Sequence, residues 1–246
     1  MIGSNIVIRM LERRGYAVVD LRRPQSDMFL EPRFVEVYRR CRPFTLTSPE
    51  RLYALYKAVE YVVKEDVEGA VVECGVWKGG SAMLSALALD RLGDTSRRVY
   101  LYDTFEGMAA PTELDGDAAR AAWAANEREG WNALCYAPLD EVRANVLGTG
   151  LAEERFVFVK GRVEDTIPDT APDRIAVLRL DTDWYESTHH ELLHLFPRLS
   201  PRGVVIVDDY GHWQGAREAV DRYFEETGQF VLLSRIDETA RLGIKA

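Results

Sequence analysis

The stretch VVECGVWKGGS, residues 71–81, decides the fold class. It opens with an apolar run that is typical of a buried strand and ends at Ser81, where a helical pattern begins. The glycines between them, Gly75, Gly79 and Gly80, let a ligand approach the backbone, and the start of the helix offers free N–H groups. Their spacing is not the G-x-G-x-x-G of dinucleotide-binding proteins. The stretch therefore predicts a strand, a ligand-binding turn and a helix.

The alternation of β-rich runs with amphipathic helical segments continues along the chain. Parallel strands are expected at 69–75, 97–103, 155–161, 174–181 and 203–209, and the runs 229–236 and 241–246 are expected to form an antiparallel hairpin at the C-terminus. Helices between parallel strands cover both faces of a sheet. We therefore predict an α/β fold with a doubly wound, mostly parallel seven-stranded sheet.

Two segments lie outside this alternation. Residues 1–68 are expected to be mainly helical and to form an N-terminal cap or lid, with Ser48 as the N-cap of a helix that begins at Pro49. Residues 107–150 form a long insertion after the second strand, and segments of that length are usually functional or mobile. The main domain is then expected over 69–246.

Composition restricts the class of protein. The 246 residues carry 31 Lys and Arg against 40 Asp and Glu, a net charge of −9, which argues against nucleic acid or an anionic membrane as partner. No apolar run approaches membrane-spanning length, and the N-terminal one is too short for a signal peptide. The three cysteines are scattered, which favours a reducing compartment. We expect a soluble cytoplasmic protein.

Residues 190–194 read HELLH, which matches the H-E-x-x-H motif of zinc proteases. On a helix capped by Ser187 or Thr188, however, His190 and His194 point roughly opposite to the apolar stripe. The imidazoles then face solvent, whereas a zinc protease needs them in a buried cleft. We interpret the motif as a chance match on a surface helix.

Acidic residues follow several of the expected strands. Asp103 ends the second strand, where a carboxylate can accept ribose hydroxyls, and together with Glu73 it suggests S-adenosylmethionine (SAM). Asp181, Asp208 and Asp209 end two later strands. If those strands are adjacent, their carboxylates converge and suit Mg²⁺ or another hard divalent ion, although acids also populate strand ends for no special reason.

Three further residues are candidates for the same region. Asp183 is two residues beyond Asp181 and can reach a substrate, whereas Lys78 and His212 are weaker candidates.

With these motifs assembled, the chain resembles the macrocin O-methyltransferase (TylF-type) family, whose members are metal-dependent SAM methyltransferases that modify sugar hydroxyls of antibiotics and related natural products. The matching motifs are VVECGVWKGGSA, YLYDTFEGM, VKGRVEDTIP, LRLDTDWYEST and VIVDDYGHWQGAREAVDRYF, in family order over about residues 45–225. The arrangement is also similar to catechol O-methyltransferase, which uses a divalent ion at the same strand ends. The implied fold is the Rossmann-like one of class I SAM methyltransferases.

The resemblance also implies a role for each matching residue. The methionine part of SAM would be held by Glu73, Gly75, Val76, Gly79, Gly80 and Ser81; ribose and adenine by Asp103, Thr104 and Phe105; the other side of adenine by Gly161, Val163 and Glu164; and the metal by Asp181, Asp208 and Asp209, with Asp183 as the general base.

The predicted function is thus a SAM- and Mg²⁺-dependent O-methyltransferase that acts on a sugar hydroxyl of a glycosylated natural product, with two neighbouring hydroxyls on the metal. A phenol or catechol methyltransferase and a non-catalytic SAM-binding module are the alternatives. The acceptor stays open, because residues 1–44 and 107–140 match the family least. The helical N-terminal segment makes a homo-oligomer plausible.

Overall fold

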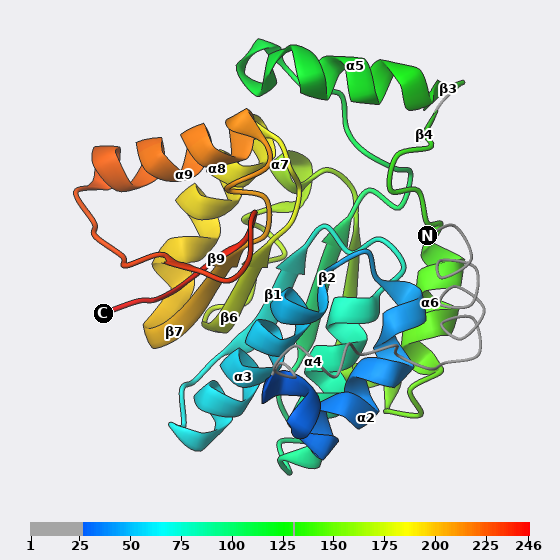
Figure 1. Ribbon diagram of the computed structural model, residues 1–246, viewed down its shortest axis with the longest axis vertical. Coiled ribbons are helices and arrows are strands. Elements are labelled where there is room, and N and C mark those ends of the chain that lie inside the picture. Colours follow the sequence, from blue (N-terminus) through cyan, green and yellow to red (C-terminus); the bar gives the residue numbers. More distant parts are fainter. Residues whose placement is uncertain (1–26, 130) are drawn as a thin grey trace, which may run out of the picture.

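The computed structural model describes residues 27–129 and 131–246. Its centre is a seven-stranded sheet in the order β5-β2-β1-β6-β7-β9-β8 (Figure 1). The strands are β1 (Ala70–Cys74), β2 (Val99–Asp103), β5 (Phe156–Lys160), β6 (Ile175–Leu180), β7 (Leu199–Val207), β8 (Ser234–Arg235) and β9 (Arg241–Ile244). The strands from β5 to β7 pair in parallel, and β9 is antiparallel to both of its neighbours. The predicted α/β sheet with a C-terminal antiparallel hairpin is confirmed.

The hairpin is shorter than the sequence suggests. Strand β8 has two residues, although the whole run 229–236 is β-rich. The side chains of Phe230 and Leu232 are 89% and 75% exposed, because β8 is the edge strand and pairs with β9 through only two residues. The exposed hydrophobic residues of this run therefore do not lengthen β8.

Helices cover both faces of the sheet. On one face lie α2 (Pro32–Cys41), α3 (Pro49–Lys64), α4 (Gly80–Arg91) and α6 (Leu139–Leu147), and on the other α7 (Val163–Thr166), α8 (Tyr185–Leu195) and α9 (Gln214–Thr227). Short 3₁₀ helices are η1 (Asp27–Leu30), η2 (Arg42–Phe44), η3 (Glu113–Asp115), η4 (Glu153–Arg155) and η5 (Phe196–Arg198). The doubly wound arrangement is as predicted. In the described part of the chain, no helix has the length and hydropathy that a membrane span needs.

The predicted N-terminal cap lies partly outside the described residues, which begin at Asp27. Helix α3 starts as expected: Ser48 Oγ accepts the N–H of Arg51 at 3.2 Å, and Pro49 is the first helical residue. Val59 on this helix is fully buried in the same core as the sheet. The helix is therefore an integral layer of the fold, and a lid role for the rest of the segment stays a prediction.

The insertion carries helix α5 (Gly116–Asn126) and a two-residue hairpin of β3 (Glu127–Arg128) with β4 (Trp131–Asn132). Helix α5 lies away from the sheet at the top of Figure 1, and Ala119 is its one buried residue. The insertion is tied down at Asp115, whose Oδ1 accepts the N–H of Tyr185 at 2.6 Å. Helix α8 accordingly begins at Tyr185, so the predicted caps Ser187 and Thr188 are wrong.

Candidate active site

The glycine-rich turn joins β1 to α4 at the carboxyl edge of the sheet. Gly75 has a φ of +83°, and a Cβ there would lie 2.0 Å from the Asp181 carbonyl oxygen, so only glycine fits where the turn passes the next strand. The side chain of Asp103 holds the turn, because its Oδ2 accepts the N–H groups of Val76 at 2.7 Å and Trp77 at 3.1 Å. A carboxylate from the neighbouring strand thus fixes the shape of the turn.

Two adjoining cavities open at this edge. The first, about 600 Å³ with its open mouth, has a size that is usual for a small-molecule site. Among the predicted SAM residues it is lined by Gly75, Asp103, Thr104, Gly161, Val163 and Glu164. The second, about 800 Å³, is lined by Glu73, Gly75, Val76, Ser81 and Asp103 from the SAM set, and by Asp181, Asp183, Asp208 and Asp209. The structure therefore brings most of the predicted residues together.

Three of the predicted SAM residues line neither cavity: Gly79, Gly80 and Phe105. A Cβ on Gly80 would lie 2.7 Å from the carbonyl oxygen of Phe44, and one on Gly79 would lie 2.8 Å from the side chain of Val146. Close packing of α4 against its neighbours explains why these two positions are glycine.

Asp103 has less freedom than the sequence suggests. Besides the two N–H groups on Oδ2, its Oδ1 accepts the N–H of Phe105 at 2.7 Å. Burial raises the pKa of this carboxyl, and the backbone donors lower it. Oδ1 has one donor and can accept a second hydrogen bond, so Asp103 can shape the turn and still receive a ligand hydroxyl from the cavities that it lines.

Glu73 is the buried acid at the end of β1. Its Oε1 accepts Nη1 of Arg179 at 2.7 Å, whereas its Oε2 is buried with no hydrogen-bond partner among the described residues. Burial raises the pKa of Glu73 to about 7 against the opposing effect of Arg179. A buried acceptor without a donor is costly unless a ligand satisfies it, and the ammonium group of SAM is a donor of the right charge. The residues present therefore fit the cofactor.

Asp181, Asp208 and Asp209 converge as the sequence predicts. Strands β6 and β7 are parallel neighbours with Leu180 opposite Val207, so the residues that follow them lie side by side. Within residues 27–129 and 131–246, these three acids are the group whose ligand atoms all lie within 4.8 Å of one another. Three carboxylates are the donor set of a hard divalent cation.

Asp183 lies in the same cavity on the loop that follows β6. Its φ is +69°, an uncommon value for a residue with a side chain. Burial raises its pKa to about 7; a hydrogen bond with Asp209 lowers it, and the charges of Asp181 and Asp208 raise it. A carboxylate with a pKa near neutrality is suited to accept a proton.

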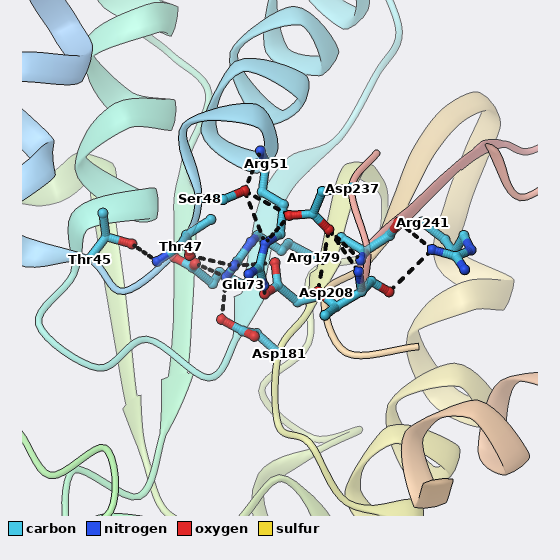
Figure 2. Close-up of polar contacts among 12 residues, drawn as sticks. Thr45, Thr47, Ser48, Arg51, Glu73, Arg179, Asp181, Asp208, Asp237 and Arg241 are labelled. Atoms are coloured by element: carbon cyan, nitrogen blue, oxygen red, sulfur yellow. Dashed lines mark hydrogen bonds and ion pairs between the residues drawn. The ribbon is translucent and has the colours of Figure 1, made fainter. Parts of the chain in front are cut away.

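Sequence reasoning missed two arginines in this cavity. Arg179, the next-to-last residue of β6, donates from Nη1 to Asp181 at 2.7 Å and from Nη2 to Asp208 at 2.6 Å (Figure 2). Arg51, from α3, pairs with the other oxygen of Asp208 and, through Nε, with Asp237 at 2.9 Å. The sequence could have predicted a buried ion pair at Arg179, because a charged residue inside the apolar run IAVLRL needs a buried partner.

The charges of the second cavity can be compared directly. Six carboxylates line it (Glu73, Asp103, Asp181, Asp183, Asp208 and Asp209), against the two guanidinium groups of Arg51 and Arg179. Burial raises the pKa of most of these acids, which favours their protonated forms unless further positive charge arrives. A divalent cation and the sulfonium of SAM both supply it, so the donor set fits a metal as well as the cofactor.

The HELLH side chains do not form a metal site. His190 Nε2 lies 3.0 Å from the carbonyl oxygen of Ile167, and its ring is 4.4 Å from that of His194. Glu191 points the other way and is fully buried, with Oε1 accepting the Thr182 hydroxyl at 3.0 Å. The two imidazoles are half-buried, and neither lines the two cavities.

The weaker candidates lie elsewhere. Lys78 pairs with Glu141 at 3.1 Å, and His212 is exposed beside Trp213. Neither Lys78 nor His212 lines a cavity at the carboxyl edge.

Comparison with known proteins gives a consistent picture. The family model described as Macrocin-O-methyltransferase (TylF) matches residues 31–242. The chain is 41% identical over 195 residues to the 8-demethyl-8-(2,3-dimethoxy-alpha-L-rhamnosyl)-tetracenomycin-C 4'-O-methyltransferase of Streptomyces olivaceus, a match that covers 79% of this chain and 73% of that protein. It is 34% identical over 202 residues to the mycinamicin III 3''-O-methyltransferase of Micromonospora griseorubida, which covers 81% and 76%.

A solved structure supports the same relationship. The O-methyltransferase NovP superposes with a TM-score of 0.74 at 34% sequence identity, over 82% of each chain.

Proposed function

The chain belongs to the macrocin O-methyltransferase (TylF) family and is a SAM-dependent O-methyltransferase, and on this premise we propose that it methylates a sugar hydroxyl of a glycosylated natural product at a site that holds a divalent cation such as Mg²⁺. The observation that carries the proposal is the convergence of Asp181, Asp208 and Asp209 beside Asp183 in one cavity. The names of two relatives, a rhamnosyl-tetracenomycin methyltransferase and a mycinamicin methyltransferase, support the class of acceptor.

In this proposal, the two cavities bind different parts of SAM. The first holds the adenosine part of SAM between Asp103 and the segment Gly161–Glu164, and the second holds the methionine part near Glu73. The cofactor supplies an electrophilic methyl group. Gly75 and Asp103 line both cavities, so a cofactor held across them would supply its methyl group on the side of the acids.

Asp183 is the proposed general base. It would accept the proton of the acceptor hydroxyl while that oxygen takes the methyl group, whose bond to sulfur breaks and leaves neutral S-adenosylhomocysteine, and it would then release the proton to solvent. A cation on the three aspartates would supply Lewis acidity toward the hydroxyl oxygens of the acceptor. The position of Asp183 is fixed by its neighbour Trp184, whose Nε1 donates to the carbonyl oxygen of Ala109 at 2.8 Å. That bond also joins the base to the insertion.

The acceptor would enter from the side of the second cavity. Leu46 lines that cavity and is 69% exposed, and Met108 and Cys135 of the insertion line it as well. The rings of Trp131 and Tyr136 lie 4.5 Å apart on the insertion and are partly exposed. Tyr136 directly follows Cys135, which lines the cavity, and aromatic surfaces suit the apolar faces of a sugar or its aglycone.

Calorimetric titration of SAM and of Mg²⁺ into EDTA-treated protein is the first test. We expect two separate binding events, and only that of Mg²⁺ should disappear when EDTA is added. SAM binding without a Mg²⁺ site would overturn the metal-dependent part of the proposal.

An acceptor survey then separates sugars from phenols. Rhamnosylated aglycones and simple catechols are incubated with SAM, and methyl transfer is followed by mass spectrometry. Transfer to catechols alone would replace the sugar acceptor with a phenolic one and leave the metal site unaffected.

A further inference from the structure

Asp208 has a guanidinium partner on each of its oxygens. Arg179 Nη2 donates to Oδ1 at 2.6 Å, and Arg51 Nη1 pairs with Oδ2 (Figure 2). The Asp208 side chain is only 3% exposed, so water contributes little to these contacts. A cation that uses Oδ2 of Asp208 must therefore share it with Arg51 or displace Arg51.

The two arginines are held very differently. The Arg179 side chain, near the end of β6, is 3% exposed and also binds Glu73 and Asp181, so several buried contacts hold it in place. Arg51 stands on α3 at the cavity wall, and its side chain is 18% exposed. Arg51 is thus the one of the two that can leave Asp208 without breaking the sheet.

A second acceptor for Arg51 is already present. Nε of Arg51 lies 2.9 Å from Oδ2 of Asp237, in the loop between β8 and β9. Asp237 is itself fixed, because its Oδ1 accepts the N–H groups of Thr239 and Ala240, each at 2.9 Å. Its Oδ2 also accepts the Ser48 hydroxyl at 2.8 Å. A small rotation of the guanidinium can therefore release Asp208 while the contact with Asp237 is kept.

We propose that Arg51 is a gate on the candidate metal site: it competes with the divalent cation for Oδ2 of Asp208 and transfers to Asp237 when the cation binds. This inference rests on the proposed function, because it takes Asp181, Asp208 and Asp209 as the metal ligands. The physical basis is charge. A guanidinium a few ångströms from a divalent cation repels it, and the repulsion is strong where little water screens it.

Calorimetric titration of Mg²⁺ into the EDTA-treated full chain tests the gate through affinity alone. Arg51→Met removes the competing charge and keeps an unbranched side chain, so Mg²⁺ should bind roughly tenfold tighter or more. Asp237→Asn removes the charge that receives Arg51, so Mg²⁺ should bind more weakly than to the wild type. A cooperative urea denaturation transition, measured in parallel, reports that each variant is folded.

Lys57→Met is the matched control. It removes a positive charge from an exposed position on the same helix, where Lys57 pairs with Glu60 and Glu31, and it should leave Mg²⁺ affinity unchanged. If Arg51 instead supports Asp208 in a metal-binding geometry, Arg51→Met will weaken Mg²⁺ binding, and the gate is wrong.

Because the two variants act in opposite directions, failure of one to fold leaves the other decisive. Equal Mg²⁺ affinity of the wild type and both variants would also overturn the gate, with the metal site intact. Absence of Mg²⁺ binding in the wild type and in Arg51→Met alike would remove the metal site of the proposed function, and the gate with it.

Discussion

Nη1 of Arg179 lies 2.7 Å from Oε1 of Glu73, so a buried guanidinium on β6 is bound to a buried carboxylate on the neighbouring strand β1. Through its other contacts, the same guanidinium binds Asp181 and Asp208. One counter-ion is therefore shared by three acids: Glu73, beside the proposed methionine site, and the proposed metal ligands Asp181 and Asp208. Removing either side of such a pair leaves a buried charge without compensation.

We expect Arg179→Met to lower the free energy of unfolding by about 3–5 kcal/mol, because three acids then lose their buried partner. Arg179→Lys should cost less, since it keeps the charge but loses the planar, multiple hydrogen bonds of the guanidinium. Urea denaturation of the three proteins in EDTA measures both effects. A Met variant as stable as the wild type would mean that the acids are protonated together and do not depend on Arg179.

Asp181→Ala should abolish turnover and leave SAM binding largely intact. Asp181 contributes to the acid triad, whereas in the proposed function the cofactor depends on Glu73, Asp103 and the glycine-rich turn. Methyl transfer and SAM calorimetry on the same preparation separate the two functions. Full activity of the variant would show that the metal assignment is wrong.

Asp103→Asn should weaken SAM binding by roughly tenfold or more, since a buried hydrogen-bonded carboxylate contributes about 1–3 kcal/mol. The amide would place an NH₂ group against one of the backbone N–H groups that now point at Asp103, from Val76, Trp77 or Phe105. Calorimetry of SAM measures the loss. Unchanged affinity would indicate that Asp103 neither shapes the turn nor receives the ribose.

Asp183→Asn should reduce kcat by about 10²–10⁴-fold and remove the acid limb of the pH–rate profile. The base acts only when ionised, so the rate of the wild type should rise with pH through the pKa of Asp183. Burial raises that pKa to about 7, and a bound cation lowers it, so the limb is expected at or below neutrality. Rates at saturating SAM on both sides of neutral pH give the profile. An acid limb that persists in the Asn variant would assign it to another group.

The sheet and its acidic edge were predictable because they follow from short-range rules. Apolar runs of strand length separated by helices specify a parallel sheet, and parallel neighbours place their carboxyl ends together. The register that pairs Leu180 with Val207 is a direct consequence, and it sets Asp181 beside Asp208. The turn glycines and Asp103 were identified for the same reason.

The contacts that hold this edge were not predictable, because they join segments far apart in sequence. Arg51 reaches Asp208 from 157 residues away, and Asp115 fixes the start of α8 from an insertion 70 residues earlier. No local sequence pattern predicts either contact. Glu191 is a further case: the HELLH motif was interpreted as a chance match on a surface helix, and no local pattern predicted that its glutamate is buried against the loop that carries the site.

Glu191 supplies a prediction that is independent of any ligand. It is fully buried, and one of its oxygens has no partner among the described residues, so burial holds its pKa well above the usual range. The folded chain keeps the proton while the unfolded chain releases it above a pH of about 4.3. This group therefore stabilises the fold fully only below that pH, and its contribution falls as pH rises toward the folded-state pKa.

Glu191→Gln has no proton to lose. Its stability relative to the wild type should increase by about 1.4 kcal/mol for each unit of pH above the unfolded-state pKa, until the folded-state pKa is reached. Urea denaturation of both proteins at mildly acidic and at neutral pH gives this difference directly, because the other titrating acids contribute equally to the two chains. Glu225→Gln, at an exposed glutamate on α9, is the matched control and should show no such trend. A difference between Glu191→Gln and the wild type that is the same at both pH values would mean that Glu191 is ionised in the folded protein, with an undetected cationic partner.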